Sequence, residues 1–152
     1  AGSVADAQAL VRLLQAECRL FRLRNGRGMN TKNAAHLLAN VMFQYKYFPY
    51  YVQLLVAGMD EKGEIYSLDP LGGLTEERMA STGSGSPMAY GLLEDSYKRE
   101  GTIKENLAIA AKAIATAMKR DVATGEYVDV VTITKNGFKR LEKGEVAKLL
   151  ES

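Results

Sequence analysis

The residues best suited to chemistry form a loop at 81–91. It reads Ser-Thr-Gly-Ser-Gly-Ser-Pro-Met-Ala-Tyr-Gly and places hydroxyl groups and glycines directly before a predicted helix. Glycines at 83 and 85 permit positive φ and a close approach to a partner. Ser86 is predicted to cap the helix, and Pro87 suits its first turn. The loop can therefore present hydroxyl and N–H donors to a reacting group, although a tight, well-capped turn explains the same residues.

Composition argues against several other chemistries. His36 is the only histidine; it lies in a helical pattern and is most simply a packing or surface residue, so no metal or other cofactor is expected. The single cysteine, Cys18, excludes an internal disulfide and fits a cytoplasmic location. A formal net charge of +2 gives no field that favours nucleic acid or an anionic membrane, and no apolar run is long enough to span a bilayer.

Hydrophobic spacing predicts the elements that must position the loop. In chain order they are a helix pair, three strands, a second helix pair, two strands and a short helix. Their ranges are 3–25 and 31–45, then 51–59, 64–69 and 75–81, then 87–98 and 102–118, then 127–134 and 138–141, and finally a helix after Gly144. Hairpin-joined strands and paired helices predict a single α+β domain over residues 1–152, with antiparallel sheets between helix layers.

Four segments spread over the chain carry a family resemblance. They are Ala1-Gly2 before Asp6-Ala7-Gln8, the run Tyr-Val-Gln-Leu-Leu-Val-Ala-Gly at 51–58, the loop at 81–91, and Arg-Asp-Val-Ala-Thr-Gly at 120–125. In this order and spacing the sequence resembles a proteasome β subunit, most closely the archaeal kind. The resemblance extends over nearly the whole chain.

The resemblance implies an architecture and an activity. The fold would be that of the N-terminal nucleophile hydrolases, a four-layer αββα sandwich. The activity would be that of a threonine-type endopeptidase that degrades proteins, in heptameric rings of β subunits stacked with α-subunit rings. Expected partners are other β subunits, the α-subunit ring, unfolded protein substrates and, indirectly, an ATPase regulator.

The resemblance also implies roles for residues at the start of the chain. Gly2 matches the glycine whose backbone N–H helps to hold the oxyanion, and its place just before a helix N-terminus agrees with that role. Ala1 and Val4 match positions that line the pocket for the residue before the scissile bond.

A supporting network is implied further along the chain. Ser84 matches a serine near the amine of the catalytic threonine, Asp121 matches the aspartate of that network, and Thr124 falls where the family often has serine. Hydroxyls and a carboxylate around an amine would orient it and set its pKa. The residues alone favour a different role for Asp121, an ion pair with Arg120 or Lys119 at a helix end. The resemblance favours the network.

The sequence departs from the family at its start. The family's nucleophile is a threonine at the mature N-terminus, on strands that also carry an aspartate and a lysine, whereas Ala1 opens this sequence and nothing in it matches those strands. We expect a proteasome-type domain truncated at its N-terminus and inactive alone. The alternative is a non-catalytic, structural ring subunit. A phosphate-binding module with its loop at 83–86 is disfavoured, because the loop lacks the lysine of a P-loop.

Overall fold

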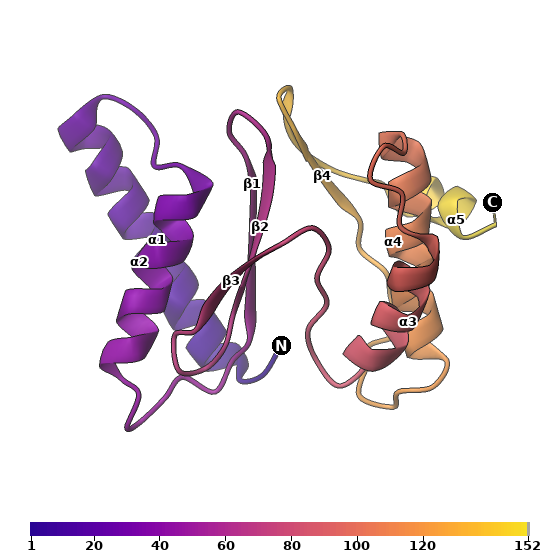
Figure 1. The fold of residues 1–152 in the computed structure, drawn as a ribbon, viewed down its shortest axis with the longest axis horizontal. Helices are drawn as coiled ribbons and strands as arrows, with labels where there is room; N and C mark the ends of the chain where they lie inside the picture. Colours follow the sequence, from indigo (N-terminus) through magenta and orange to yellow (C-terminus); the bar gives the residue numbers. More distant parts are fainter. Residues whose placement is uncertain (152) are drawn as a thin grey trace. The chain divides into compact units, whose positions relative to one another are not determined.

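The chain forms two compact units. The computed structural model describes residues 1–151, which divide into a first unit, Ala1–Ala80, and a second unit that begins at Ser81 (Figure 1). Each unit combines helices with antiparallel strands, so the predicted α+β class is confirmed. The assignment of residues 1–152 to a single domain stays a prediction. Within residues 1–151, every helix is too short or too polar to cross a lipid bilayer.

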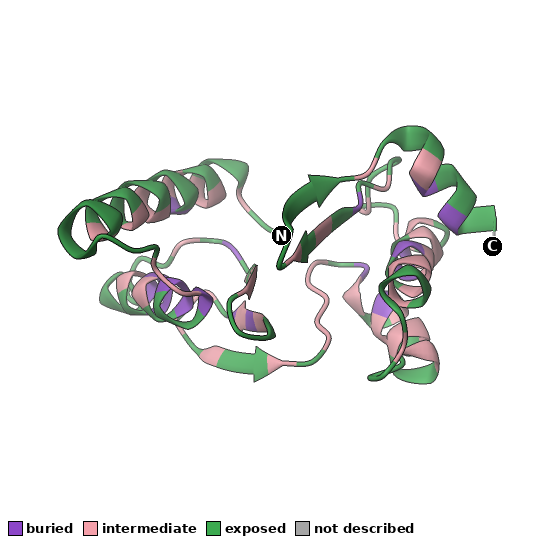
Figure 2. Cartoon of the chain, turned by 90° about the horizontal axis from the view of Figure 1, so that it is seen from above, coloured by how far each residue is buried: buried purple, intermediate pink, exposed green. Residues whose placement is uncertain are grey.

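The first unit packs two helices against a three-stranded sheet. Its elements are α1 (Val4–Asn25), α2 (Thr31–Gln44), β1 (Leu54–Met59), β2 (Gly63–Leu68) and β3 (Leu74–Glu77). The sheet is antiparallel in the order β1-β2-β3. Its core joins Leu10 of α1 and Met42 of α2 to Tyr66 and Leu68 of β2, all of them buried. Figure 2 shows the buried residues of the chain in purple. Removing this apolar surface from water holds the helices on the sheet.

The helix ends of the first unit follow the predicted signals. Ser3 caps α1 and its side chain accepts the N–H of Asp6, while Gly26 ends the helix in the left-handed conformation at φ 67°. Asn30 caps α2 in the same way. The predicted strand at 51–59 is shorter than expected, because β1 begins only at Leu54 and Val52 pairs with Gly2 instead.

The second unit combines three helices with a two-stranded hairpin. Its elements are α3 (Ser86–Ser96), α4 (Ile103–Met118), β4 (Val131–Thr134), β5 (Gly137–Arg140) and α5 (Lys143–Glu151). The hairpin turns at Asn136-Gly137 as predicted, with Gly137 at φ 109°. A small core joins α4, α5 and the strand region through Ala111, Val130, Val146 and Leu149.

The start of α3 corrects two predictions. Ser86 does not cap the helix but is its first residue, and Gly85 is the cap, without a side-chain hydrogen bond. The chain has already turned at Gly83, where φ is 103° and the C=O accepts the N–H of Ser86, so the helix starts one residue early. Gly85 itself has φ −80°, which any residue can adopt. The glycine at position 85 is therefore not explained by its backbone conformation.

Candidate active site

Three polar side chains of the second unit meet beyond the end of α4. Ser84 lies in the loop before α3, and Asp121 and Thr124 lie in the turn that follows α4. Ser84 Oγ donates to Asp121 Oδ2 at 2.6 Å, and Thr124 Oγ1 donates to the same oxygen at 2.5 Å. We call Ser84, Asp121 and Thr124 the Asp121 cluster. It joins parts of the chain that lie 37 residues apart.

Local backbone geometry builds one side of the Asp121 cluster. The N–H of Asp121 donates to the C=O of Ala117 at 2.8 Å, which continues the helical turn past the end of α4. The N–H of Thr124 then donates to the C=O of Asp121 at 3.2 Å. This turn brings the side chains of Asp121 and Thr124 to the same side of the chain, where Ser84 meets them.

Hydrogen bonding favours the ionised form of the Asp121 carboxyl group. The Ser84 hydroxyl lowers the pKa of Asp121 most, and the Thr124 hydroxyl lowers it further. Both donors stabilise the charged carboxylate and have no comparable interaction with the protonated acid. Among residues 1–151, the ion pairs are Lys62–Glu76, Lys98–Glu105, Lys139–Glu145 and Arg140–Asp129. Asp121 is thus held by hydroxyls, and not by Arg120 or Lys119.

The Asp121 cluster offers acceptors to a further group. A hydroxyl has one proton and two lone pairs. Because Ser84 and Thr124 both direct their protons at Asp121 Oδ2, their oxygens retain lone pairs that can accept N–H groups. Ser84 is exposed, so an incoming amine can reach it. The cluster is therefore suited to orienting an amine.

In the first unit, the backbone N–H of Gly2 is directed away from its neighbouring segment. The N–H of Gln53 donates to the C=O of Ala1 at 2.9 Å, and the N–H of Ser3 donates to the C=O of Tyr51 at 2.7 Å. Gly2 stands between these bonds, opposite Val52, so its own N–H points to the other side. Within residues 1–151, no backbone carbonyl accepts this N–H.

Only glycine fits at position 2. Its φ is 116°, and a Cβ there would lie 2.1 Å from the carbonyl oxygen of Tyr51. The apolar side chains of Ala1 and Val4 flank it and are exposed, that of Val4 with 71% of its surface. The structure thus groups Ala1, Gly2 and Val4 in the first unit and Ser84, Asp121 and Thr124 in the second. Their roles in binding or catalysis stay predictions.

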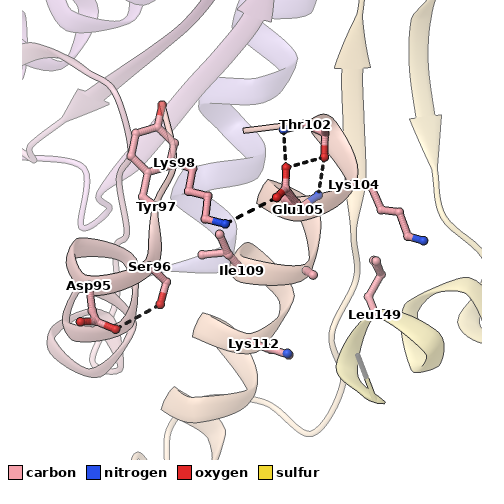
Figure 3. A pocket seen from close by; sticks show the side chains of 11 residues that line it. Asp95, Ser96, Tyr97, Lys98, Thr102, Lys104, Glu105, Ile109, Lys112 and Leu149 are labelled. Atoms are coloured by element: carbon pink, nitrogen blue, oxygen red, sulfur yellow. Dashed lines mark hydrogen bonds and ion pairs between the residues drawn. The ribbon is translucent and has the colours of Figure 1, made fainter. Parts of the chain in front are cut away.

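A second group of polar residues, with a pocket, lies at the start of α4. Thr102 and Glu105 form a capping box, in which Glu105 accepts the N–H and the hydroxyl of Thr102, both at 2.8 Å, and pairs with Lys98 at 3.5 Å (Figure 3). We call Lys98, Thr102 and Glu105 the Glu105 cluster. The N–H of Thr102 is the main cause of a lowered pKa of Glu105. The sequence predicted the capping box from the spacing of Thr102 and Glu105.

The pocket beside the Glu105 cluster was not predicted. It has a volume of about 730 Å³, and its lining includes Lys104, Lys112 and Leu149 (Figure 3). No motif in the sequence signals it, because it forms where the α3–α4 loop, α4 and α5 meet. Its carboxylate at Glu105 already serves the start of α4, so we do not take it as the reaction site. Residues 1–151 hold no group of three His, Cys, Asp or Glu side chains that could hold a metal ion.

The chain is similar to known proteasome subunits over most of its length. The family model for the proteasome subunit matches residues 1–133. The proteasome subunit beta of Methanosarcina mazei is 53% identical over 148 residues, which cover 96% of this chain and 70% of that protein. The corresponding subunit of Methanosarcina barkeri is 51% identical over all of this chain and 73% of its own length. That of Archaeoglobus profundus is 49% identical over all of this chain and 72% of its own length.

Proposed function

The chain belongs to the proteasome subunit family, and on that premise we propose that it is part of a threonine-type endopeptidase that degrades proteins to peptides. The predicted resemblance to archaeal β subunits is confirmed by the family match and by the identities of about one half. The Asp121 cluster is the observation that carries the proposed activity, because its two hydroxyl oxygens can accept N–H groups from an amine.

In the proposed reaction, a threonine hydroxyl attacks the scissile carbonyl while the amine of the same threonine takes up the proton. The Asp121 cluster orients that amine, since Ser84 and Thr124 offer lone pairs and Asp121 fixes both hydroxyls. The N–H of Gly2 donates a hydrogen bond to the carbonyl oxygen as negative charge develops on that oxygen. Ala1 and Val4 contact the substrate side chain before the scissile bond.

The proposed nucleophile is not among residues 1–152, so these residues expressed alone should not cleave peptides. We propose that the subunit assembles with other β subunits and an α-subunit ring in the cytoplasm. Unfolded proteins would be its substrates, delivered indirectly by an ATPase regulator.

Expression of the full-length gene product with its α subunit tests the proposal. The purified particle should cleave a fluorogenic peptide, and mass spectrometry should find threonine at the N-terminus of the mature subunit. Ser84→Ala should lower kcat/KM about tenfold, because one of two acceptors of the amine is lost. A particle that assembles without cleaving and without an N-terminal threonine would contradict the proposal and favour a structural ring subunit.

A further inference from the structure

Gly85 lies where the two parts of the Asp121 cluster approach each other. It is buried between the loop that carries Ser84 and the end of α4. A Cβ on residue 85 would lie 2.5 Å from Thr124 Oγ1, 2.9 Å from the Cβ of Ala117 and 3.3 Å from Asp121 Oδ2. Distances below about 3.0 Å force one of the atoms to move. The space that a side chain would need is therefore already filled by the cluster and its support.

Backbone conformation does not explain this glycine. Gly85 has φ −80° and ψ −2°, a conformation open to every amino acid. Gly83, two residues earlier, differs, because its φ of 103° requires glycine for the turn itself. The demand for glycine at 85 comes from its contacts with Thr124, Ala117 and Asp121.

We propose that Gly85 is a positioning residue that seats the Thr124 hydroxyl against Asp121. Without a side chain at 85, the Ser84 loop can approach α4 closely enough for one carboxylate oxygen to accept both hydroxyls. The catalytic consequence rests on the proposed function, whereas the effect on the geometry of the cluster does not.

The atoms around Gly85 differ in how far they can move away from an added Cβ. Rotation about χ1 of Thr124 can move Oγ1 away from residue 85, but this breaks its hydrogen bond to Asp121. Ala117 is fixed in α4 and only 2% exposed, so it cannot give way and instead pushes residue 85 outward. Because Thr124 Oγ1 is both the nearest of these atoms and the one that is free to rotate, a single added methyl group removes the Thr124 contact of Asp121 first.

The test uses the full-length, assembled protein with four variants. They are Gly85→Ala, Thr124→Ala, the double variant, and Gly91→Ala as the matched control, since Gly91 lies on α3 with nothing within 4 Å of an added Cβ. We expect Gly85→Ala and Thr124→Ala each to lower kcat/KM about tenfold, and Gly91→Ala to stay within about twofold. The double variant should be about as active as either single one, because both changes remove the same hydrogen bond.

The pH profile separates positioning from a general loss of structure. The acid limb of kcat/KM should shift in the same direction in Gly85→Ala and Thr124→Ala and remain in place in Gly91→Ala. Losses that multiply to about 100-fold in the double variant would overturn the proposal, as would a Gly85→Ala enzyme indistinguishable from Gly91→Ala.

A structure of the Gly85→Ala protein gives a readout that needs no activity. We expect Thr124 Oγ1 out of hydrogen-bonding distance of Asp121, and an intact Thr124–Asp121 bond would overturn the proposal even if the parent protein does not cleave peptides. Failure of cleavage by the parent would contradict only the proposed function. If Gly85→Ala does not assemble, Thr124→Ala and Ala117→Gly added to it together should restore assembly, since they remove both atoms that an added Cβ would meet within 3.0 Å. Their failure to do so would also count against the proposal.

Discussion

The two ends of α4 each hold a carboxylate with hydroxyl partners, and they use it differently. At the start, Glu105 accepts the backbone N–H and the hydroxyl of one residue, Thr102, three positions away. Beyond the end, Asp121 Oδ2 accepts the hydroxyls of Ser84 and Thr124. The Glu105 cluster thus satisfies an otherwise unpaired donor of the helix, whereas the Asp121 cluster fixes two side chains.

This difference shows that the Glu105 cluster stabilises a helix, whereas the Asp121 cluster is suited to take part in chemistry. Glu105 lowers the free energy of the folded helix, and its oxygens are committed to Thr102 and Lys98. Asp121 leaves the lone pairs of Ser84 and Thr124 directed elsewhere, ready for another donor. A lowered carboxyl pKa occurs in both clusters and therefore does not identify the site; the partners that cause it do.

Removing the carboxylate of each cluster should give the largest contrast in kcat/KM. In the assembled, full-length protein, Asp121→Ala should lower kcat/KM for a fluorogenic peptide about 100-fold, because both hydroxyls lose their orientation. Glu105→Ala, the matched control, should leave kcat/KM within about twofold. Equal losses in the two variants would show that both carboxylates act only through the stability of the second unit.

The Thr124 hydroxyl should have the next largest effect. Thr124→Val keeps the shape of the side chain but replaces the hydroxyl with a methyl group, and we expect kcat/KM to fall about tenfold. Thr124→Ser keeps the hydroxyl and should stay within about twofold. A serine variant as poor as the valine variant would assign Thr124 a packing role.

The Thr102 hydroxyl should affect stability and not activity. Thr102→Ala removes the side-chain cap of α4 and should lower the free energy of unfolding by about 1 kcal/mol, measured by urea denaturation. Thr102→Ser should retain most of that free energy, and kcat/KM at a permissive temperature should match the parent in both variants. A selective loss of kcat/KM in Thr102→Ala would contradict the distinction between the clusters.

The two clusters should also differ, by a smaller amount, in how the stability of the protein depends on acid pH. Asp121 has a folded-state pKa below its ordinary value, so it contributes stability above about pH 4 that is lost as pH falls through the folded pKa. Ser84→Ala removes the main cause of that lowering and should reduce the loss of stability below pH 4. Thr102→Ala should change the acid response less, because the main cause at Glu105 is a backbone N–H that the substitution retains. The urea midpoints of both variants, measured from about pH 5 to about pH 2, check these expectations, because that range spans the ordinary carboxyl pKa of about 4. An unchanged acid response in Ser84→Ala would contradict the role of the Ser84 hydroxyl in lowering the pKa of Asp121.

Local signals predicted much of the fold and less of the site. The Ser3 cap, the capping box at Thr102 and Glu105, and the Asn136-Gly137 hairpin depend on neighbours within a few residues, and the structure confirms them. The Ser86 cap was wrong, because the turn at Gly83 starts the helix early.

The candidate site depends on contacts that the sequence does not encode locally. No spacing rule joins Ser84 to Asp121, and only the family resemblance suggested that they belong together. The contact that makes Gly85 necessary is likewise absent from any local pattern, since positive φ was the expected reason and φ is −80°. The outward N–H of Gly2 depends on pairing with a segment about fifty residues away.

A structure of the full-length, assembled protein at side-chain resolution would show whether the Asp121 cluster orients the amine of the nucleophile. The amine of the proposed threonine nucleophile should lie within about 3.2 Å of Ser84 Oγ, with Ser84 and Thr124 both still donating to Asp121. If that amine lies elsewhere and backbone N–H groups fill the acceptor positions of the Asp121 cluster, as the N–H of Thr102 does at Glu105, the Asp121 cluster is structural and does not orient the nucleophile.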